Sequence, residues 1–233
     1  MESFETRVEN ERVYTQLYHP QYADERIVLF CHGFPGTNRL PHLAGFLDST
    51  KTSLAEINYR GDAKSTGKFS FLRAIDDIKE VTTSLREKYL GTKVYGLGYS
   101  CGGLYVLNIV RDNPHFFDGV YLLNPVLDTY FLSDSPLMAE LWDYAKNMLS
   151  LEEKNFYQRE TATINKNHNP MDFAGDLETS VTLFQSTEDE VLPLADVHQF
   201  MAKLKGDKKL ILIPQRQHDL EGNEREIKEG LSY

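Results

Sequence analysis

The sequence predicts an α/β fold in which a mostly parallel sheet has helices on both faces. Short runs of β-branched and apolar residues alternate with longer segments whose apolar residues recur every three or four positions. Glycines and prolines separate the two kinds of segment. This alternation is typical of parallel strands joined by crossover helices.

The predicted strands begin with a hairpin and continue as crossover strands. Residues 4–8 and 12–18 flank a short polar turn, which suits an antiparallel hairpin at one edge of the sheet. Residues 27–31 form the continuous apolar run that a strand buried on both faces requires. Further strands are expected at residues 54–59, 94–98, 120–123, 181–185 and 210–213.

Three predicted helices connect these strands. The apolar residues of segment 71–89 fall on one stripe, which predicts a helix with one face on the sheet. Residues 101–113 have apolar side chains on several faces and stop before Pro114, so we expect this helix to be covered all round. Apolar residues from Val197 to Leu204 mark a third helix facing the sheet.

Residues 127–177 interrupt the alternation, because they contain no convincing strand. We interpret them as a helical cap inserted over the carboxyl edge of the sheet, within a single domain that spans residues 1–233. Ser135 followed by Pro136 suits the start of one cap helix. Ser150 with Glu153 suits the start of a second helix through a capping box.

The composition disfavours several classes of function. A formal net charge of −10, from 25 Lys and Arg against 35 Asp and Glu, would repel phosphate backbones and anionic lipid surfaces. No apolar run approaches the roughly 20 residues that span a bilayer, and the amino-terminal residues lack a signal-peptide pattern. We therefore expect a cytoplasmic protein that binds neither nucleic acid nor membrane. The oligomeric state is left open, with a homodimer as one option.

The pentapeptide Gly-Tyr-Ser-Cys-Gly at residues 98–102 lies between a predicted strand and a predicted helix. This context favours a nucleophile elbow, a strained turn that lifts the hydroxyl of Ser100 clear of the backbone. Gly98 and Gly102 would remove the clashes that Cβ atoms meet where the strand and the helix approach. The alternative is an ordinary glycine-rich turn.

Two backbone N–H groups are candidates for an oxyanion hole beside this serine. One belongs to Cys101, at the start of the helix whose dipole would stabilise a developing negative charge. We assign the second to Phe34, in the loop of residues 32–36 at the carboxyl end of a predicted central strand. In that loop, His32 is interpreted as a packing residue.

A serine hydroxyl requires a general base, and the base requires an acid that orients it. Among seven histidines, His218 follows the last predicted strand, where it would reach back to the elbow. Asp189 is the preferred acid, four residues after the strand that ends at Gln185. Three other carboxylates remain alternatives for this role, namely Glu188, Glu190 and Asp128.

With these motifs in the order serine, acid, histidine, the chain resembles the α/β-hydrolase superfamily over nearly its whole length. Residues 59–61 and 67–70 are also similar to esterase, acyl-peptidase and serine-aminopeptidase branches with small caps. The resemblance implies an eight-stranded sheet, a cap after the sixth strand and no required cofactor. Cys101 departs from the small or methionine-like residues expected after the nucleophile. If the strands before Cys31 and Cys101 are adjacent, these cysteines lie close together, and we expect both to be reduced thiols without a metal.

The expected cap is rich in apolar and aromatic residues, most of which we assign to packing. Tyr99, Leu141 and Trp142 are the candidates for substrate binding. We hypothesise a carboxylesterase that acts on small apolar acyl or aryl esters through an acyl-enzyme. One alternative is a serine aminopeptidase, acyl-peptidase or amidase that binds the amine of a short peptide through Glu140 or Asp143. Another is a catalytically silent member of the fold that only binds.

Overall fold

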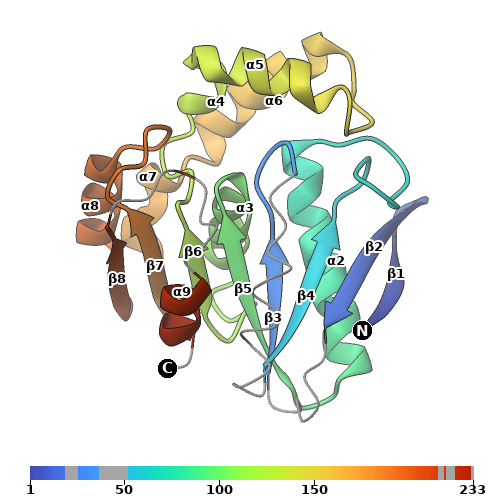
Figure 1. Ribbon diagram of the computed structural model, residues 1–233, viewed down its shortest axis with the longest axis horizontal. Helices are drawn as coiled ribbons and strands as arrows, with labels where there is room; N and C mark the ends of the chain where they lie inside the picture. Colours follow the sequence, from blue (N-terminus) through green and yellow to red (C-terminus); the bar gives the residue numbers. More distant parts are fainter. Residues whose placement is uncertain (19–25, 37–51, 215–217, 219–223, 232–233) are drawn as a thin grey trace.

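The computed structural model describes residues 1–18, 26–36, 52–214, 218 and 224–231 (Figure 1). In this part of the chain one sheet has eight strands in the order β1-β2-β4-β3-β5-β6-β7-β8. Strands β1 and β2 form an antiparallel hairpin, and β2 also pairs antiparallel with β4. The other neighbouring pairs are parallel. The predicted fold class is therefore confirmed.

The strands are β1 (Glu2–Val8), β2 (Glu11–Tyr18), β3 (Arg26–Cys31), β4 (Thr52–Asn58), β5 (Lys93–Tyr99), β6 (Val120–Leu123), β7 (Val181–Ser186) and β8 (Lys208–Ile213). The helices are α2 (Phe71–Lys88), α3 (Cys101–Asp112), α4 (Phe131–Asp134), α5 (Pro136–Ala145), α6 (Lys154–Asn167), α7 (Pro170–Phe173), α8 (Leu194–Lys203) and α9 (Glu224–Leu231), with a 3-10 turn η2 (Ala174–Asp176). Each predicted strand lies within two residues of an observed one.

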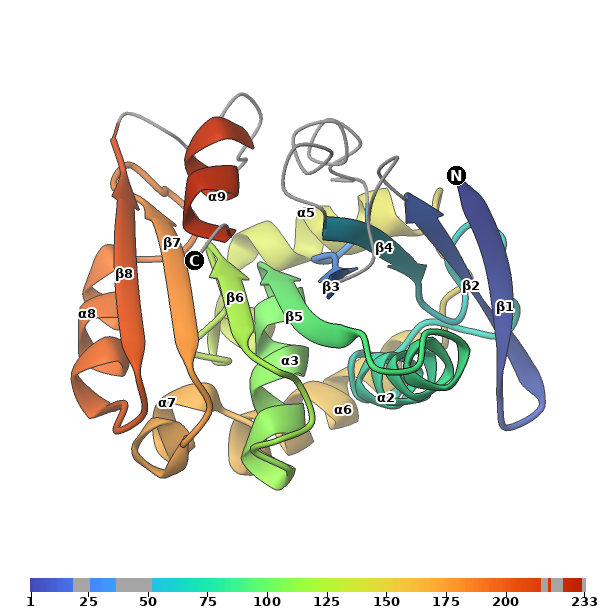
Figure 2. The same ribbon diagram turned by 90° about the horizontal axis from the view of Figure 1, so that it is seen from below.

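Helices α2, α3 and α8 cover one face of the sheet, and α9 lies on the other face (Figure 2). On β3, Ile27 and Leu29 join the core that contains α2, α3 and α8, whereas Val28 and Phe30 join the core that contains α9. This alternation follows from the two-residue period of a strand. Helix α3 is buried from Cys101 to Val110, as expected for a helix covered all round.

Helix α9 is one of the described elements that were not predicted from the sequence. Its Ile227 and Leu231 are buried in an apolar core that also contains residues from β3 to β8. The two residues are four positions apart, which is helical spacing, but an eight-residue segment offers too few apolar positions to show a period.

Helices α4, α5 and α6 lie beyond the carboxyl ends of β5 and β6 (Figure 1). Helix α5 begins at Pro136 after Ser135, as predicted, but the prediction of a capping box at Ser150 is wrong. The backbone N–H of Ser150 donates to Gly61 and its carbonyl accepts from Phe69, so Ser150 is held in an extended bridge to the core. Helix α6 begins four residues later.

The end of the expected insertion lies elsewhere. Residues 170–176, which form α7 and η2, pack against α3 and α8 rather than over the sheet edge. The segment that covers the carboxyl edge is thus shorter than residues 127–177. Among the described helices, none combines the length and the apolar character needed to cross a bilayer.

Candidate active site

The turn between β5 and α3 places Ser100 in a strained backbone conformation, with φ 53° and ψ −119°. Glycines make this turn sterically feasible. A Cβ atom added at Gly98 would lie 2.6 Å from the carbonyl oxygen of Gly102, and one added at Gly102 would lie 1.8 Å from the carbonyl oxygen of Cys31. Side chains at both positions are excluded, so the elbow requires the sequence that it has.

The side chains of Ser100, His218 and Asp189 lie in one line of contacts. His218 Nε2 is 3.1 Å from Ser100 Oγ, and His218 Nδ1 is 2.9 Å from Asp189 Oδ2. The Asp189 side chain is 1% exposed and that of His218 is 20% exposed, so only the histidine reaches the surface. The structure brings together three residues that are up to 118 positions apart in the sequence.

Asp189 is held by four N–H donors. Its Oδ1 accepts from the backbone N–H groups of Val191 (2.8 Å) and Leu192 (2.9 Å), and its Oδ2 accepts from Gln185 Nε2 (3.3 Å) as well as from His218. Burial raises the pKa of the Asp189 carboxyl, but the His218 contact and the backbone donors outweigh it, so this pKa lies below its ordinary value. An ionised Asp189 holds the proton on Nδ1, which leaves Nε2 as an acceptor for Ser100.

The alternative acids do not contact the histidine. Glu188 and Glu190 are exposed on the same loop as Asp189. Asp128 accepts a hydrogen bond from the backbone N–H of Tyr130, which is a local turn contact. Of the carboxylates considered in the sequence, Asp189 is the one in contact with His218.

The two residues whose backbone N–H groups are the candidate oxyanion donors both lie at the cavity beside Ser100. Burial raises the pKa of the Cys101 thiol to about 12, and hydrogen bonds from the Phe34 backbone, the Ser100 side chain and the Cys101 backbone oppose this rise. Phe34 and Cys101 line the same cavity as Ser100. Cys31 and Cys101 are both buried and free.

His32 braces the loop that contains Phe34, in agreement with its interpretation as a packing residue. Its Nε2 is 3.2 Å from Asp62 Oδ2 and its Nδ1 is 2.8 Å from the carbonyl oxygen of Gly33. The Tyr59 hydroxyl donates to the carbonyl oxygen of His32 at 3.1 Å. These contacts hold the loop against β4 and its following turn.

A cavity of about 240 Å³ opens beside Ser100. Its walls are mostly apolar, and they come from the loop after β3, the elbow, the cap, the loop after β7 and His218 after β8. The lining residues are Gly33, Phe34, Pro35, Gly36, Tyr99, Ser100, Cys101, Phe131, Leu137, Met138, Leu141, Val191 and His218.

Two of the three predicted substrate-binding residues, Tyr99 and Leu141, line this cavity. Trp142 does not. It packs on Phe34, with ring centroids 4.5 Å apart. Among the described residues, no group of three or more His, Cys, Asp or Glu side chains suits a metal ion.

Asn124 is a residue near the site that the sequence analysis did not single out. Its side-chain amide donates to the carbonyl oxygen of His218 at 2.8 Å, and the Tyr99 hydroxyl donates to the same oxygen at 3.2 Å. The Asn-Pro pair at residues 124–125 signals a turn after β6, but it does not indicate that the turn contacts His218.

Comparisons with known proteins agree with this architecture. Residues 23–173 match the sequence profile of a hydrolase family described as serine aminopeptidase, S33, and residues 121–232 match that of the PhoPQ-activated pathogenicity-related proteins. A monoglyceride lipase homolog of Monkeypox virus is 22% identical over 126 residues, which are 52% of this chain and 46% of the relative. The chain thus matches about half the length of that relative.

Solved structures show the same fold. Est1E from Butyrivibrio proteoclasticus, in a complex with ferulic acid, is 18% identical with a TM-score of 0.80, over 98% of this chain and 96% of Est1E. The monoacylglycerol lipase of Paleococcus ferrophilus is 18% identical with a TM-score of 0.72, over 94% of this chain and 98% of the lipase. Because the first family profile covers well over half of the chain, this protein belongs to the serine aminopeptidase S33 family of the α/β-hydrolase superfamily.

Proposed function

We propose that this protein is a carboxylesterase that cleaves small esters with apolar acyl or aryl groups. The proposal depends on one observation, the unbroken contact from Ser100 through His218 to Asp189 at the wall of an apolar cavity. In this proposal Ser100 is the nucleophile, His218 the general base and Asp189 the acid that orients it.

In the first half of the reaction, Ser100 Oγ attacks the ester carbonyl carbon while His218 Nε2 accepts the hydroxyl proton. The carbonyl oxygen becomes an oxyanion, which the N–H groups of Phe34 and Cys101 stabilise. The intermediate then collapses, the bond to the alcohol oxygen breaks, and His218 returns the proton to the leaving alcohol. An acyl-enzyme on Ser100 remains.

In the second half, a water molecule takes the place of the alcohol. His218 removes a proton from this water, which attacks the acyl carbon, and the same two N–H groups stabilise the second oxyanion. Breakage of the bond to Ser100 Oγ releases the carboxylic acid and returns the proton to Ser100. No group outside this chain and water is required.

The cavity favours an uncharged substrate over an amine. Its described lining includes no carboxylate that could bind an ammonium group. Of the two acids considered for this purpose, Glu140 is exposed, and Asp143 is exposed and paired with Lys146. This arrangement supports an esterase rather than an aminopeptidase.

The size of the cavity favours a small acyl group. About 240 Å³ lies below the roughly 300–1,000 Å³ of pockets that hold drug-sized ligands. A short acyl chain or a single aromatic ring fits this size and the apolar lining. The ferulic acid in the Est1E complex is an aromatic acid, which supports an aryl group as one candidate.

Labelling with a fluorophosphonate tests the chemistry. The wild-type protein is expected to be labelled, Ser100→Ala to give no labelling, and Ser133→Ala, on the exposed face of α4, to be labelled like the wild type. A folded wild-type protein that resists the probe contradicts the proposal and favours a binding protein.

Substrate panels then test the substrate class. We expect short-chain and benzoyl p-nitrophenyl esters to be hydrolysed, with Ser100→Ala reducing kcat by roughly 10⁶-fold. Aminoacyl anilides are expected to be poor substrates. Anilide hydrolysis with a kcat/KM above that of the esters would instead favour the peptidase.

A further inference from the structure

The turn that follows β6 contacts the backbone of the elbow on both sides of Ser100. The Ser100 N–H donates to the carbonyl oxygen of Leu123, and the Val126 N–H donates to the carbonyl oxygen of Ser100, both at 3.0 Å. Residues 123–126 therefore fix the position of the elbow relative to β6.

Asn124, inside this turn, connects the turn to the end of β7 and to His218. It is fully buried, with φ 40°. Its Oδ1 accepts from the Ser186 N–H at 2.8 Å, and its own N–H donates to the carbonyl oxygen of Phe184 at 3.0 Å, both at the end of β7 that leads to Asp189. Its Nδ2 donates to the carbonyl oxygen of His218 at 2.8 Å.

The chemistry of this position suits asparagine. Asparagine adopts positive φ more readily than most residues other than glycine. Its amide donates and accepts at the same time, whereas a carboxylate only accepts and glycine has no side chain. Both properties are used here, because the turn requires the backbone conformation and the two contacts require opposite hydrogen-bonding roles.

We propose that Asn124 is a positioning residue for the hydrolytic reaction. It holds the main chain of His218 at the place where Nε2 meets Ser100 and Nδ1 meets Asp189, and it does so from a turn that is itself bonded to Ser100 and to β7. It does not line the cavity, so it acts through His218 rather than on the substrate. This role rests on the proposed function.

Two variants of Asn124 and one matched control test the role. Asn124→Asp keeps the shape and the acceptor but places a carboxylate against the carbonyl oxygen of His218. Asn124→Gly keeps the backbone conformation and loses both side-chain contacts. The control, Asn108→Asp, changes another buried amide, on α3, which donates to the carbonyl oxygen of Leu104 in the same helix and to that of His168 at the end of α6. Circular dichroism and urea unfolding verify that each variant is folded.

For ester hydrolysis, both Asn124 variants are expected to lose roughly 100-fold in kcat, the size of effect that a misplacement of about 1 Å produces, with KM within about twofold of the wild type. For Asn124→Asp, the ratio of its kcat to that of the wild type is expected to rise as the pH falls, because the protonated carboxyl regains a donor. For Asn124→Gly the ratio is expected to be independent of pH. Asn108→Asp is expected to lose stability but to keep its kcat.

Two kinetic results would overturn the inference. One is a kcat of Asn124→Gly within about threefold of the wild type. The other is an equal loss in Asn124→Asp and Asn108→Asp, which would indicate a general effect of buried charge.

A readout that does not depend on activity separates this inference from the proposed function. Proton NMR of protein with ¹⁵N-labelled histidine observes the His218 Nδ1–H that faces Asp189, assigned by its absence in His218→Gln. This signal is expected in the wild type and in Asn108→Asp, and it is expected to be lost by exchange with solvent in Asn124→Gly. An unchanged signal in Asn124→Gly overturns the positioning role even if the wild type hydrolyses no ester.

Discussion

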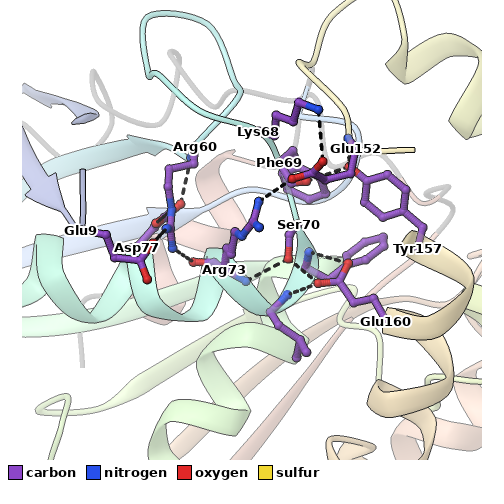
Figure 3. A network of polar contacts seen from close by, with 12 residues as sticks. Glu9, Arg60, Lys68, Phe69, Ser70, Arg73, Asp77, Glu152, Tyr157 and Glu160 are labelled. Carbon is purple, nitrogen blue, oxygen red and sulfur yellow. Dashed lines mark hydrogen bonds and ion pairs between the residues drawn. The ribbon is translucent and has the colours of Figure 1, made fainter. Parts of the chain in front are cut away.

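The two halves of the cap meet the core through different kinds of contact. The half that contains α6 is held by hydrogen bonds and ion pairs to the loop and helix that follow β4 (Figure 3). Glu160 accepts from the Ser70 hydroxyl and from the N–H groups of Phe71 and Leu72, at the start of α2. The Tyr157 hydroxyl donates to the carbonyl oxygen of Phe69 at 2.7 Å.

The half that contains α5 lies on the core through apolar side chains. Trp142 packs on Phe34 and on Tyr157, with ring centroids 4.5 Å and 4.2 Å apart, and Leu141 lines the cavity. Among the described side chains of α5, the polar contact that the structure shows is the local pair of Asp143 with Lys146.

This difference indicates that the two halves of the cap have different roles. Hydrogen bonds are directional, so the α6 half fixes where the cap lies. Apolar contacts are not directional, so the α5 half can adapt its shape to an acyl group without losing a specific partner. Changes in the α6 half should therefore affect stability, and changes in the α5 half should affect substrate preference.

The largest effect on stability is expected for Glu160→Ala. The substitution leaves the buried donors at the start of α2 without their acceptor, which should lower the free energy of unfolding by about 2–3 kcal/mol. Urea unfolding measures this loss. Glu153→Ala changes an exposed carboxylate whose side chain makes no capping hydrogen bond, and it should cost less than about 0.5 kcal/mol. Equal losses in the two variants would contradict the anchoring role of α6.

A somewhat smaller loss is expected for Trp142→Ala, where the two halves meet. Its half-buried indole contacts Phe34, Phe71 and Tyr157, so its removal should cost about 2 kcal/mol and should also raise KM for aryl esters. Trp142→Phe should recover most of the stability. A Trp142→Ala variant with unchanged KM would show that Trp142 does not affect the cavity through its contact with Phe34.

The stability of the wild type relative to Glu160→Gln should depend on pH. Burial raises the pKa of Glu160 above its ordinary value of 4.5, despite the Ser70, Leu72 and Phe71 hydrogen bonds that lower it. Between 4.5 and this higher pKa the folded state binds more protons than the unfolded state. The contribution of neutral Glu160 is therefore fully present below pH 4.5 and is lost as the pH rises through the folded pKa.

Urea unfolding of both proteins from pH 4 to pH 8 measures this dependence. All other titrating groups are common to the two proteins. The difference between their free energies of unfolding therefore isolates the contribution of Glu160. A difference in the free energy of unfolding that stays constant over this pH range would mean that burial does not raise the pKa of Glu160.

Of the three truncations at Glu160, Trp142 and Leu141, Leu141→Ala is expected to cost the least stability. The side chain is only half-buried, so its truncation should lower the free energy of unfolding by less than about 1 kcal/mol. The enlarged cavity should shift the preferred p-nitrophenyl ester to a longer acyl chain, with a several-fold change in the ratio of kcat/KM values. Tyr144→Ala, on the exposed side of the same helix, should leave this ratio unchanged.

Much of the fold and of the candidate site was predictable because it is encoded by neighbours along the chain. The apolar run of β3 and the stripe of α2 reflect the periods of a strand and of a helix. The elbow is equally local, since Gly98 and Gly102 flank the serine whose turn they permit. The positions of Ser100, Asp189 and His218 after β5, β7 and β8, in that order, were sufficient to nominate all three.

Three features were decided only by the tertiary structure. Ser150 has the sequence of a helix cap, but backbone bonds to Gly61 and Phe69 hold it extended. Glu160 reaches the start of a helix about 90 positions earlier, and Asn124 reaches His218 across 94 positions. The physical reason is that a local pattern determines only which conformation a segment prefers. The partner of a buried polar group depends instead on which distant segment the packed core brings within hydrogen-bonding distance.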